Sequence, residues 1–479
     1  MSLPSPPSSH TPIPPNSAKL RPMPLPDPRP RPVSPPDAAW LRMESPTNPM
    51  TVTGVIGLGE EMALDTLRRW VSERLLPFDR FRMRIERPGS SDPRWVPDDG
   101  FDLDRHVHEV DLPAPGGKAG LQALVSRLMS TPLAFSRPPW EFHLVRGVET
   151  AGGAAGSAVV IRLHHVIGDG IALMHVLLHA ADEHYDGTAG TPPRPPKPPA
   201  RERLATTLKG AGHETLDLLT KPAHLADRAQ TVGAGAKAVA GLLAMRPDSE
   251  TVFKAETTPT KRAAWTGPIP LDQVKAVGQA LDASVNDVLM SAAAGGLRRY
   301  LAGRGGPVDG VEVRAAVPFN VRALDRAHEL GNSFGLVFVL LPVGAASARE
   351  RLRVTKARMD AVKRSAEPMV VYGILQTIGR APGWMHRQVV KMFSEKASAV
   401  LTNVPGPQEP LHILGAPVET VMFWVPQAGQ IGLGVSIISL NGSVRVGVGA
   451  DAAYAPDPGR LAAAFADEFR ALADEFAPG

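Results

Sequence analysis

Two adjacent histidines, an aspartate and a glycine stand at a spacing that suits acyl transfer. Residues 163–170 read Leu-His-His-Val-Ile-Gly-Asp-Gly, which gives the pattern H-H-x-x-x-D-G. A free histidine has a pKa of about 6.5, so its imidazole can remove the proton of a hydroxyl group near neutral pH. His164 or His165 is therefore a candidate general base, with Asp169 and Gly170 as candidate supports.

The elements around the motif place it at a turn from a strand into a helix. The β-branched run at 159–161 is typical of a buried strand, and from Gly170 onward apolar residues recur at helical spacing. Unpaired N–H groups at a helix N-terminus favour negative charge, and the glycines at 168 and 170 allow a substrate to come close. These amides could stabilise an oxyanion that develops beside a histidine.

Two other uses of the histidine pair remain open from the residues alone. A histidine pair at a strand end is often only a satisfied polar cap. His165 and Asp169, at i and i+4, could also share a helix face and bind zinc. The chain shows no further cluster of ligand-type residues, so we expect no metal, and the complete motif favours catalysis over a cap.

Composition excludes several classes of protein. The 479 residues include no cysteine, which removes disulfides, thiolate metal sites and a thioester enzyme intermediate. A net charge of +4, from 52 basic and 48 acidic residues, is too weak a field to indicate nucleic-acid binding. No apolar stretch approaches the roughly 18–20 residues that span a bilayer, and prolines interrupt the N-terminus where a signal peptide would lie. We expect a cytoplasmic protein.

Proline-rich stretches and hydrophobic periodicity divide the chain into four segments. We expect a disordered N-terminus at 1–34, a first α/β domain with the motif at 35–190, a proline-rich linker and helical crossover at 191–260, and a second α/β domain at 261–479. The periodicity predicts helices at 61–75, 120–129, 271–281, 286–301, 346–365, 369–379, 383–396 and 458–475. It predicts strands at 81–86, 142–146, 157–163, 311–317, 335–342, 399–402, 417–424, 432–440 and 443–449.

A second motif, Gly331-Asn332-Ser333-Phe334-Gly335, fits the G-x-S-x-G pattern of the hydrolase nucleophile elbow. That elbow needs a strand before the serine and a helix after it. Here a strand at 335–342 follows the serine, so Ser333 is not expected to be a nucleophile. We interpret Gly331 and Asn332 as a turn that lines the site.

Taken together, the motif, its flanks and the second half resemble the bacterial wax ester synthase and acyl-CoA:diacylglycerol acyltransferase family. The resemblance covers nearly everything from about residue 34 to the end. Besides the histidine motif, it is carried by Ser34-Pro35-Pro36-Asp37, Phe101-Asp102-Leu103-Asp104-Arg105-His106-Val107, Arg137-Pro138-Pro139-Trp140-Glu141, Val285-Asn286-Asp287-Val288, Val317-Pro318-Phe319-Asn320-Val321-Arg322, Gly331-Asn332 and Thr402-Asn403-Val404-Pro405-Gly406-Pro407.

The resemblance implies a fold like chloramphenicol acetyltransferase and the condensation domains of peptide synthetases. Two α/β domains with mixed sheets would lie side by side with a tunnel between them. In that fold the second histidine of the motif, here His165, is the general base. Asp169 would keep the loop in shape through an ion pair, and His164 would have a structural or orienting role.

The resemblance also assigns residues outside the motif. Asn286 and Asp287 match an N-D pair that supports the active centre, although both residues could simply start a helix. Trp140, Gly331, Asn332 and Asn403 are expected to contact the substrate. In two places the chain departs from the family: its P-L-W reads Pro-Pro-Trp at 138–140, and its serine-tyrosine-asparagine-glycine segment reads Ser-Leu-Asn-Gly at 439–442. These departures leave the proposed base intact and affect the expected substrate preference.

The activity that follows from the resemblance is transfer of a fatty acyl group from acyl-CoA to a long-chain alcohol or diacylglycerol, without a cofactor or a covalent enzyme intermediate. Two alternatives remain: a condensation-type acyltransferase that acts on another alcohol or amine, and a lipid-binding relative without catalysis. Lipid substrates also make contact with a membrane or lipid-droplet surface an expectation. The segment 384–393 mixes apolar and basic residues as interfacial helices do, but such a stripe is more often part of a core.

Overall fold

A computed structural model provides the structure of the chain. It describes residues 28–87, 92–112, 116–150, 152–169, 241, 244–320, 332, 334–365, 367–378, 383–413 and 415–476. The helix expected after Gly170, most of the linker and crossover, and most of the N-terminal segment expected to be disordered lie outside the described residues.

Both halves of the described chain contain helices and strands. The helices are α1 (Pro35–Met43), α2 (Leu64–Arg74), α3 (Gly117–Met129), α9 (Leu271–Ala280), α10 (Val285–Gly303), α11 (Ala348–Lys363), α12 (Glu367–Ile378), α13 (Gly383–Lys396) and α14 (Pro458–Phe476), with 3-10 turns η1 (Asp79–Arg82) and η2 (Leu103–Arg105). The strands are β1 (Arg31–Pro32), β2 (Thr51–Leu58), β3 (Met83–Glu86), β4 (Arg94–Pro97), β5 (Val107–Asp111), β6 (Trp140–Glu149), β7 (Ala155–His164), β8 (Lys261–Trp265), β9 (Ile269–Pro270), β10 (Val313–Asn320), β11 (Phe334–Leu341), β12 (Ala399–Pro405), β13 (His412–Ile413), β14 (Ala416–Trp424), β15 (Leu433–Leu440) and β16 (Ser443–Asp451).

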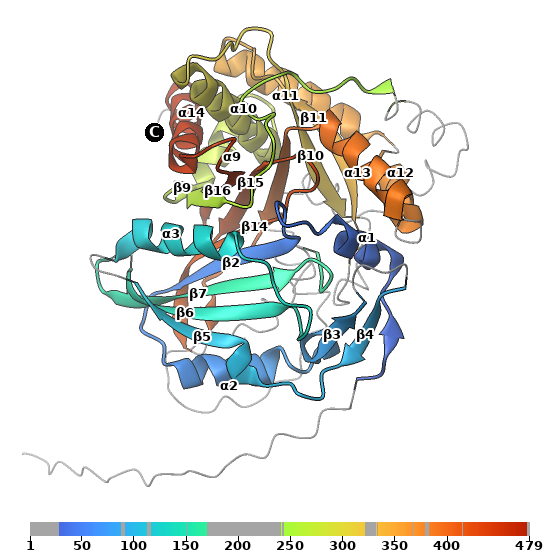
Figure 1. The fold of residues 1–479 in the computed structure, drawn as a ribbon. Helices are drawn as coiled ribbons and strands as arrows, with labels where there is room; N and C mark the ends of the chain where they lie inside the picture. Colours follow the sequence, from blue (N-terminus) through green and yellow to red (C-terminus); the bar gives the residue numbers. More distant parts are fainter. Residues whose placement is uncertain are drawn as a thin grey trace, which may run out of the picture.

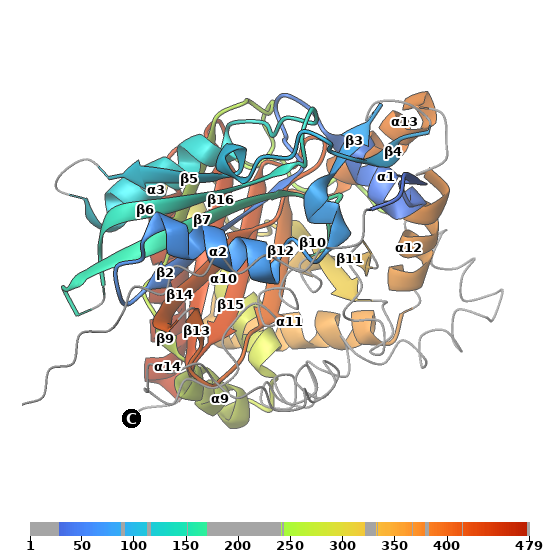
Figure 2. The same cartoon turned by 90° about the horizontal axis from the view of Figure 1, so that it is seen from below.

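The first sheet has the order β13-β14-β2-β7-β6-β5 and lies in the lower part of Figure 1. It is mixed, because β5 runs parallel to β6 while β2 and β7 pair antiparallel. Alternating apolar residues send Val159 toward α2 and Val160 toward α3, so each face of the sheet buries its own core. Seen from below, α2 lies across the outer face of this sheet (Figure 2).

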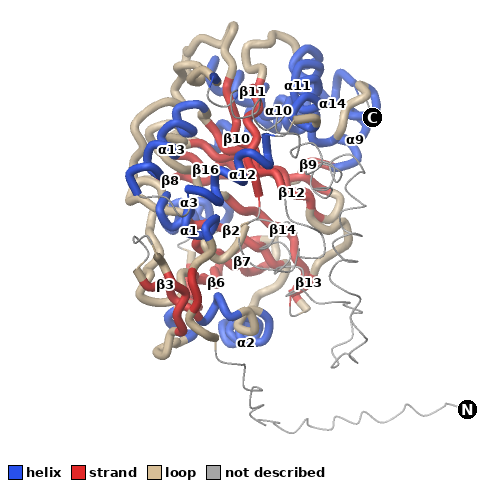
Figure 3. Tube along the Cα trace, turned by 90° about the vertical axis from the view of Figure 1, so that its right-hand side faces the viewer, coloured by secondary structure: helices blue, strands red, loops and turns tan. Residues whose placement is uncertain are grey.

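The second sheet has the order β11-β10-β12-β15-β16-β8 and is also mixed. Its strand β12 is parallel to both β10 and β15, and β15 pairs antiparallel with β16. Helices α9, α10, α11 and α14 contribute to one large apolar core together with these strands. These helices lie outside the strands in Figure 3. Mixed α/β architecture with mixed sheets is therefore confirmed on both sides of the linker.

Strand β14 belongs to the second half of the chain but lies in the first sheet, next to β2 (Figure 3). It pairs antiparallel with β2, where Trp424 lies opposite Thr53. The Trp424 ring packs beside Trp265 of β8 and over the glycines of β16. A Cβ on Gly447 would lie 2.5 Å from Met422 Cε and 2.9 Å from Trp424 Nε1, so the close approach of the two sheets requires glycine there. The sequence boundary at 261 does not anticipate this exchange.

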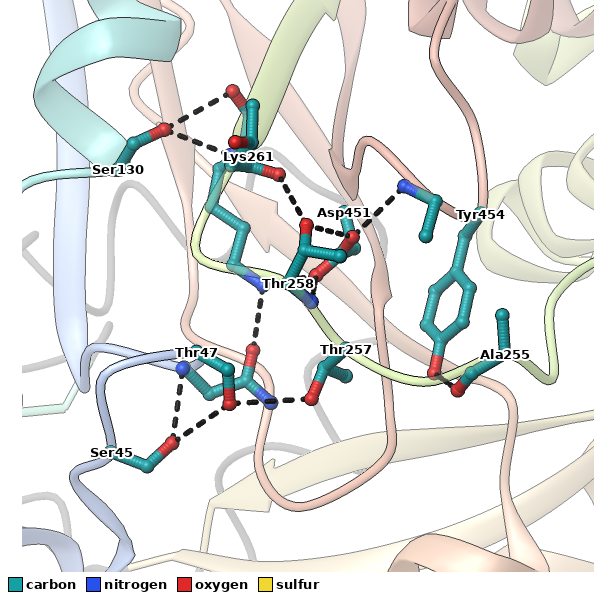
Figure 4. A network of polar contacts seen from close by, with 12 residues as sticks. Ser45, Thr47, Ser130, Ala255, Thr257, Thr258, Lys261, Asp451 and Tyr454 are labelled. Atoms are coloured by element: carbon teal, nitrogen blue, oxygen red, sulfur yellow. Dashed lines mark hydrogen bonds and ion pairs between the residues drawn. The ribbon is translucent and has the colours of Figure 1, made fainter.

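A buried polar network also joins the two halves (Figure 4). The ammonium of Lys261 lies 2.8 Å from Asp451 Oδ2 and donates to Asn48 Oδ1 at 2.9 Å. The side-chain amide of Asn48 in turn donates to the Gly429 carbonyl at 2.7 Å. Burial lowers the pKa of Lys261, and the Asp451 carboxylate opposes that shift. The segment before β2 is thus fixed to the second half.

Candidate active site

The histidine motif lies at the end of a central strand, as the sequence predicts. Strand β7 ends at His164, which is opposite Thr51 of β2. The His164 N–H donates to the Pro139 carbonyl at 2.9 Å, and the His165 N–H donates to the Met50 carbonyl at 2.7 Å. Pro139 and Met50 therefore fix the backbone of the two histidines at the end of the strand.

The imidazole of His165 is enclosed by aromatic rings. It stacks on Trp40 of α1, with ring centroids 4.0 Å apart and an interplanar angle of 17°. The ring centroid of Phe334, the first residue of β11, lies 5.8 Å from the ring centroid of His165. Only 3% of His165 is exposed, and its Nδ1 has no hydrogen-bond partner among the described residues. The two rings come from opposite halves, so His165 lies at their junction.

The enclosure keeps His165 neutral. The pKa of His165 is lowered to about 3, first of all by burial and then by the neighbouring His164, while the Asn332 side chain and the backbone of His165 oppose the shift. Burial disfavours the charged imidazolium because it removes water from the ring. At neutral pH the ring therefore retains a nitrogen that can accept a proton.

His164 has a different environment, which fits an orienting role. Its Nδ1 accepts the N–H of Val166 at 3.0 Å, so the neutral ring carries its proton on Nε2. Nε2 lies 3.3 Å from Glu44 Oε2, although this contact is not aligned as a hydrogen bond. The Glu44 carboxylate also accepts the N–H of Met50. His164 is thereby tied to the same segment that holds His165.

The side chain of Asn332 forms a hydrogen bond with the main chain of His165. Its side-chain amide donates to the His165 carbonyl at 2.8 Å and to Asp37 Oδ1 at 2.8 Å. Asn332 is 5% exposed. We expected Asn332 to line the site and to bind substrate. The structure brings it to the site, and there its amide holds the motif loop. Asp169 is buried as well, whereas Gly170 and Gly331 lie outside the described residues.

Asn286 and Asp287 start helix α10, as the simpler interpretation predicts. Ser284 and Asp287 form a capping box, in which Asp287 Oδ2 accepts the Ser284 N–H at 3.0 Å and the Asp287 N–H donates to Ser284 Oγ at 3.2 Å. Asn286 is free of that task, and its Oδ1 accepts the Asn403 amide at 2.9 Å. The structure thus joins Asn286 and Asn403, while Asp287 serves the helix.

Trp140 belongs to the core of the first half. Its side chain is fully buried and donates through Nε1 to the Phe81 carbonyl at 2.9 Å. The ring stacks on His106 with centroids 4.3 Å apart. These contacts make Trp140 a packing residue, and its expected contact with the substrate stays a prediction. Its neighbour Pro139 serves the site by accepting the N–H of His164.

Helix α13, which covers the amphipathic segment, packs one side against the protein. Val389 lies against Ala39 of α1, and the Phe393 ring stacks on Phe338 of β11 at 5.6 Å between centroids. Met385 is the large hydrophobic residue of this helix that stays exposed among the described side chains. In the part of the chain that the structure describes, no helix is long and apolar enough to cross a membrane.

The fold of the chain is shared with solved structures of two kinds. The first condensation domain of the calcium-dependent antibiotic synthetase shares the fold, with a TM-score of 0.59 and 15% identity over 93% of this chain and 97% of that domain. The wax ester synthase/diacylglycerol acyltransferase from Marinobacter aquaeolei VT8 shares it with a TM-score of 0.65 and 22% identity, over 93% and 99% of the two chains. The expected condensation-domain architecture is confirmed.

Sequence comparison gives the family. Residues 33–289 match the wax ester synthase/diacylglycerol acyltransferase catalytic domain, and residues 330–473 match the WS/DGAT C-terminal domain. A putative diacylglycerol O-acyltransferase from Mycobacterium tuberculosis (strain CDC 1551) is 31% identical over 376 residues, which cover 72% of this chain and 75% of the relative. The chain belongs to the wax ester synthase/diacylglycerol acyltransferase family and is an acyltransferase.

Proposed function

We propose that the chain moves a fatty acyl group from acyl-CoA to the hydroxyl of a long-chain alcohol or diacylglycerol, with His165 as the general base. The observation that carries this proposal is the state of His165: a buried, neutral imidazole at the junction of the two halves. The names of similar proteins support the substrate class, since one is a putative diacylglycerol O-acyltransferase and another a wax ester synthase.

The reaction proceeds in one transfer. A ring nitrogen of His165 takes the hydroxyl proton as the acceptor oxygen attacks the thioester carbonyl. When the tetrahedral intermediate collapses, the carbon–sulfur bond breaks and the imidazolium returns the proton to the CoA thiolate. The chain has no cysteine that could carry the acyl group, which supports direct transfer. General-base assistance of this kind contributes about 10²–10⁴-fold to the rate.

The two substrates approach His165 from opposite sides, through a tunnel between the halves. This path is supported by the origin of the residues around the base, because Trp40 belongs to the first half and Phe334 to the second. Low exposure of His165 excludes water, which would otherwise compete with the acceptor for the acyl group.

Contact with a membrane or lipid inclusion follows from the lipid nature of the acceptor and product. The structure limits which surface of the protein can make this contact with lipid. The apolar residues Val389 and Phe393 of α13 are partly buried against α1 and β11, so this helix is not the proposed contact surface.

An acceptor competition tests the proposal. Purified protein receives palmitoyl-CoA and an equimolar pool of a long-chain alcohol, diacylglycerol, a short alcohol and a primary amine, and mass spectrometry identifies the product. We expect wax ester, triacylglycerol or both. An amide or a short-chain ester as the main product would favour a condensation-type enzyme of another pathway. Absence of any acylated product would favour a lipid-binding relative without catalysis.

A further inference from the structure

We propose that Asp37 is a positioning residue for the general base, acting through Asn332 and Arg80 on the main chain of the motif loop. The proposal rests on the proposed function, because it assigns Asp37 to the same reaction. Asp37 lies in the first turn of α1, and none of its surface is exposed. A carboxylate in such a place requires partners, and both of its oxygens have them.

The first oxygen orients Asn332. Asp37 Oδ1 accepts the backbone N–H of Asn332 at 3.0 Å and its side-chain amide at 2.8 Å. The same amide nitrogen donates its other hydrogen to the His165 carbonyl at 2.8 Å. Because an amide group is planar, fixing one N–H on Asp37 also fixes the direction of the second N–H, which ends on the base.

The second oxygen orients Arg80 of η1. Asp37 Oδ2 lies 3.0 Å from Arg80 Nη2, while Nη1 donates to the carbonyls of Val166 at 2.7 Å and Ile167 at 3.0 Å. The guanidinium also lies over the ring of Trp95, 5.2 Å from its centroid. Because the guanidinium is planar and rigid, the position of the Asp37 carboxylate also fixes the position of the motif loop.

Asn332 and Arg80 are the two arms through which Asp37 acts, and their hydrogen bonds end on consecutive residues of the motif loop. Residues 165, 166 and 167 each offer one carbonyl, and Asn332 and Arg80 bind all three. A buried ion pair is weak support for stability by itself, because the loss of hydration offsets the attraction. In this ion pair, however, the further side-chain hydrogen bonds that Asn332 and Arg80 make to described residues end on the motif loop. The geometry points to a role in holding the loop that carries the base.

Asp37→Asn tests the role, because it keeps the size of the side chain and removes its charge. The matched control is Glu468→Gln, since Glu468 is also a buried carboxylate, paired with Arg299 at 2.8 Å and with Arg351. Displacement of catalytic groups by about 1 Å costs on the order of 10²-fold in rate. We expect Asp37→Asn to lower kcat about 100-fold with KM for acyl-CoA changed less than about threefold. Glu468→Gln should lower Tm and leave kcat within about threefold of the wild type.

A double-mutant cycle separates positioning from general damage. If Asp37 acts through Asn332, adding Asn332→Ala to Asp37→Asn should lower kcat little beyond the more damaging single variant. If Asp37→Asn does not fold, Arg80→Gln and Asn332→Ala test the two arms singly, and each should lower kcat with KM for acyl-CoA changed less than about threefold.

Several results would overturn the role. They are multiplicative losses in kcat, wild-type kcat in folded Asp37→Asn protein, or an equal loss of kcat in Glu468→Gln. A wild-type protein that forms no ester would instead overturn the proposed function, so the two failures are distinguishable.

Discussion

The stability of the fold toward acid should depend on His165. Burial lowers the pKa of this imidazole to about 3 in the folded chain, whereas an unfolded chain leaves it at about 6.5. Between these pH values the unfolded state binds a proton that the folded state does not. Stability from a neutral His165 is therefore complete above about pH 6.5 and is lost as the pH falls toward 3.

The size of the effect follows from proton linkage. Each pH unit below the unfolded pKa costs about 1.36 kcal/mol, so the loss between pH 7.5 and pH 5 is about 2 kcal/mol. For units of about 150–250 residues, 1 kcal/mol shifts Tm by roughly 2–4 °C, which predicts a decrease of about 4–8 °C from this residue.

Calorimetric melting of the wild type and His165→Gln at both pH values measures this contribution. Burial is also the largest cause that lowers the pKa of His106 and of His386. The wild type and the variant both contain these two histidines, so their effects cancel in the comparison. The wild type should lose about 4–8 °C more than the variant on acidification. Equal losses would show that His165 is not held neutral by the fold, and the argument for its state would fail.

Three further outcomes are expected. The pH profile of kcat/KM should show no acid limb near 6.5, because His165 titrates at about 3, and a clear limb at 6–7 would contradict this. Gly447→Ala should lower stability by about 1–3 kcal/mol, since its Cβ would lie 2.5 Å from Met422 Cε and 2.9 Å from Trp424 Nε1, and an unchanged Tm would show that both side chains can move. Val389→Asp should lower Tm through its contact with Ala39 and leave flotation with anionic vesicles as in the wild type, whereas reduced flotation would reassign α13 to the membrane.

Local patterns predicted many elements of this fold. The β-branched run at 159–161 predicted β7, and the apolar stripe near the end predicted α14, expected at 458–475 and observed at Pro458–Phe476. In both, burial on a face at regular spacing leaves a periodic record in the sequence. The strand that follows Ser333 also confirms that the G-x-S-x-G match lacks the context of a nucleophile elbow.

Elements with weaker periodicity were missed. Strand β2 is central and buried on both faces, so its sequence does not alternate, and two glycines interrupt its apolar run. Helix α1 is short and starts with two prolines, which suggested only the beginning of order. The exchange of β14 depends on a partner, β2, that lies more than 350 residues earlier in the chain. Pairing over that distance leaves no local pattern.

The same distinction applies to the site. The motif predicted which histidines gather at the turn, because the chemistry needs those residue types close together in sequence. Trp40, Glu44 and Arg80 were missed, since they reach the motif through the fold. Asp37 offered one signal: a carboxylate placed just before an apolar run, Ala-Ala-Trp-Leu, implies burial and hence a buried partner.

The central claim is that His165 removes the acceptor proton. Its most direct test is the rate of ester formation by His165→Ala with palmitoyl-CoA and the acceptor that the competition identifies. Wild type and variant are compared at equal folded concentration. The account predicts that kcat falls by about 10²–10⁴-fold while the variant remains folded at pH 7.5. Ester formation at the wild-type rate by folded His165→Ala protein would contradict it.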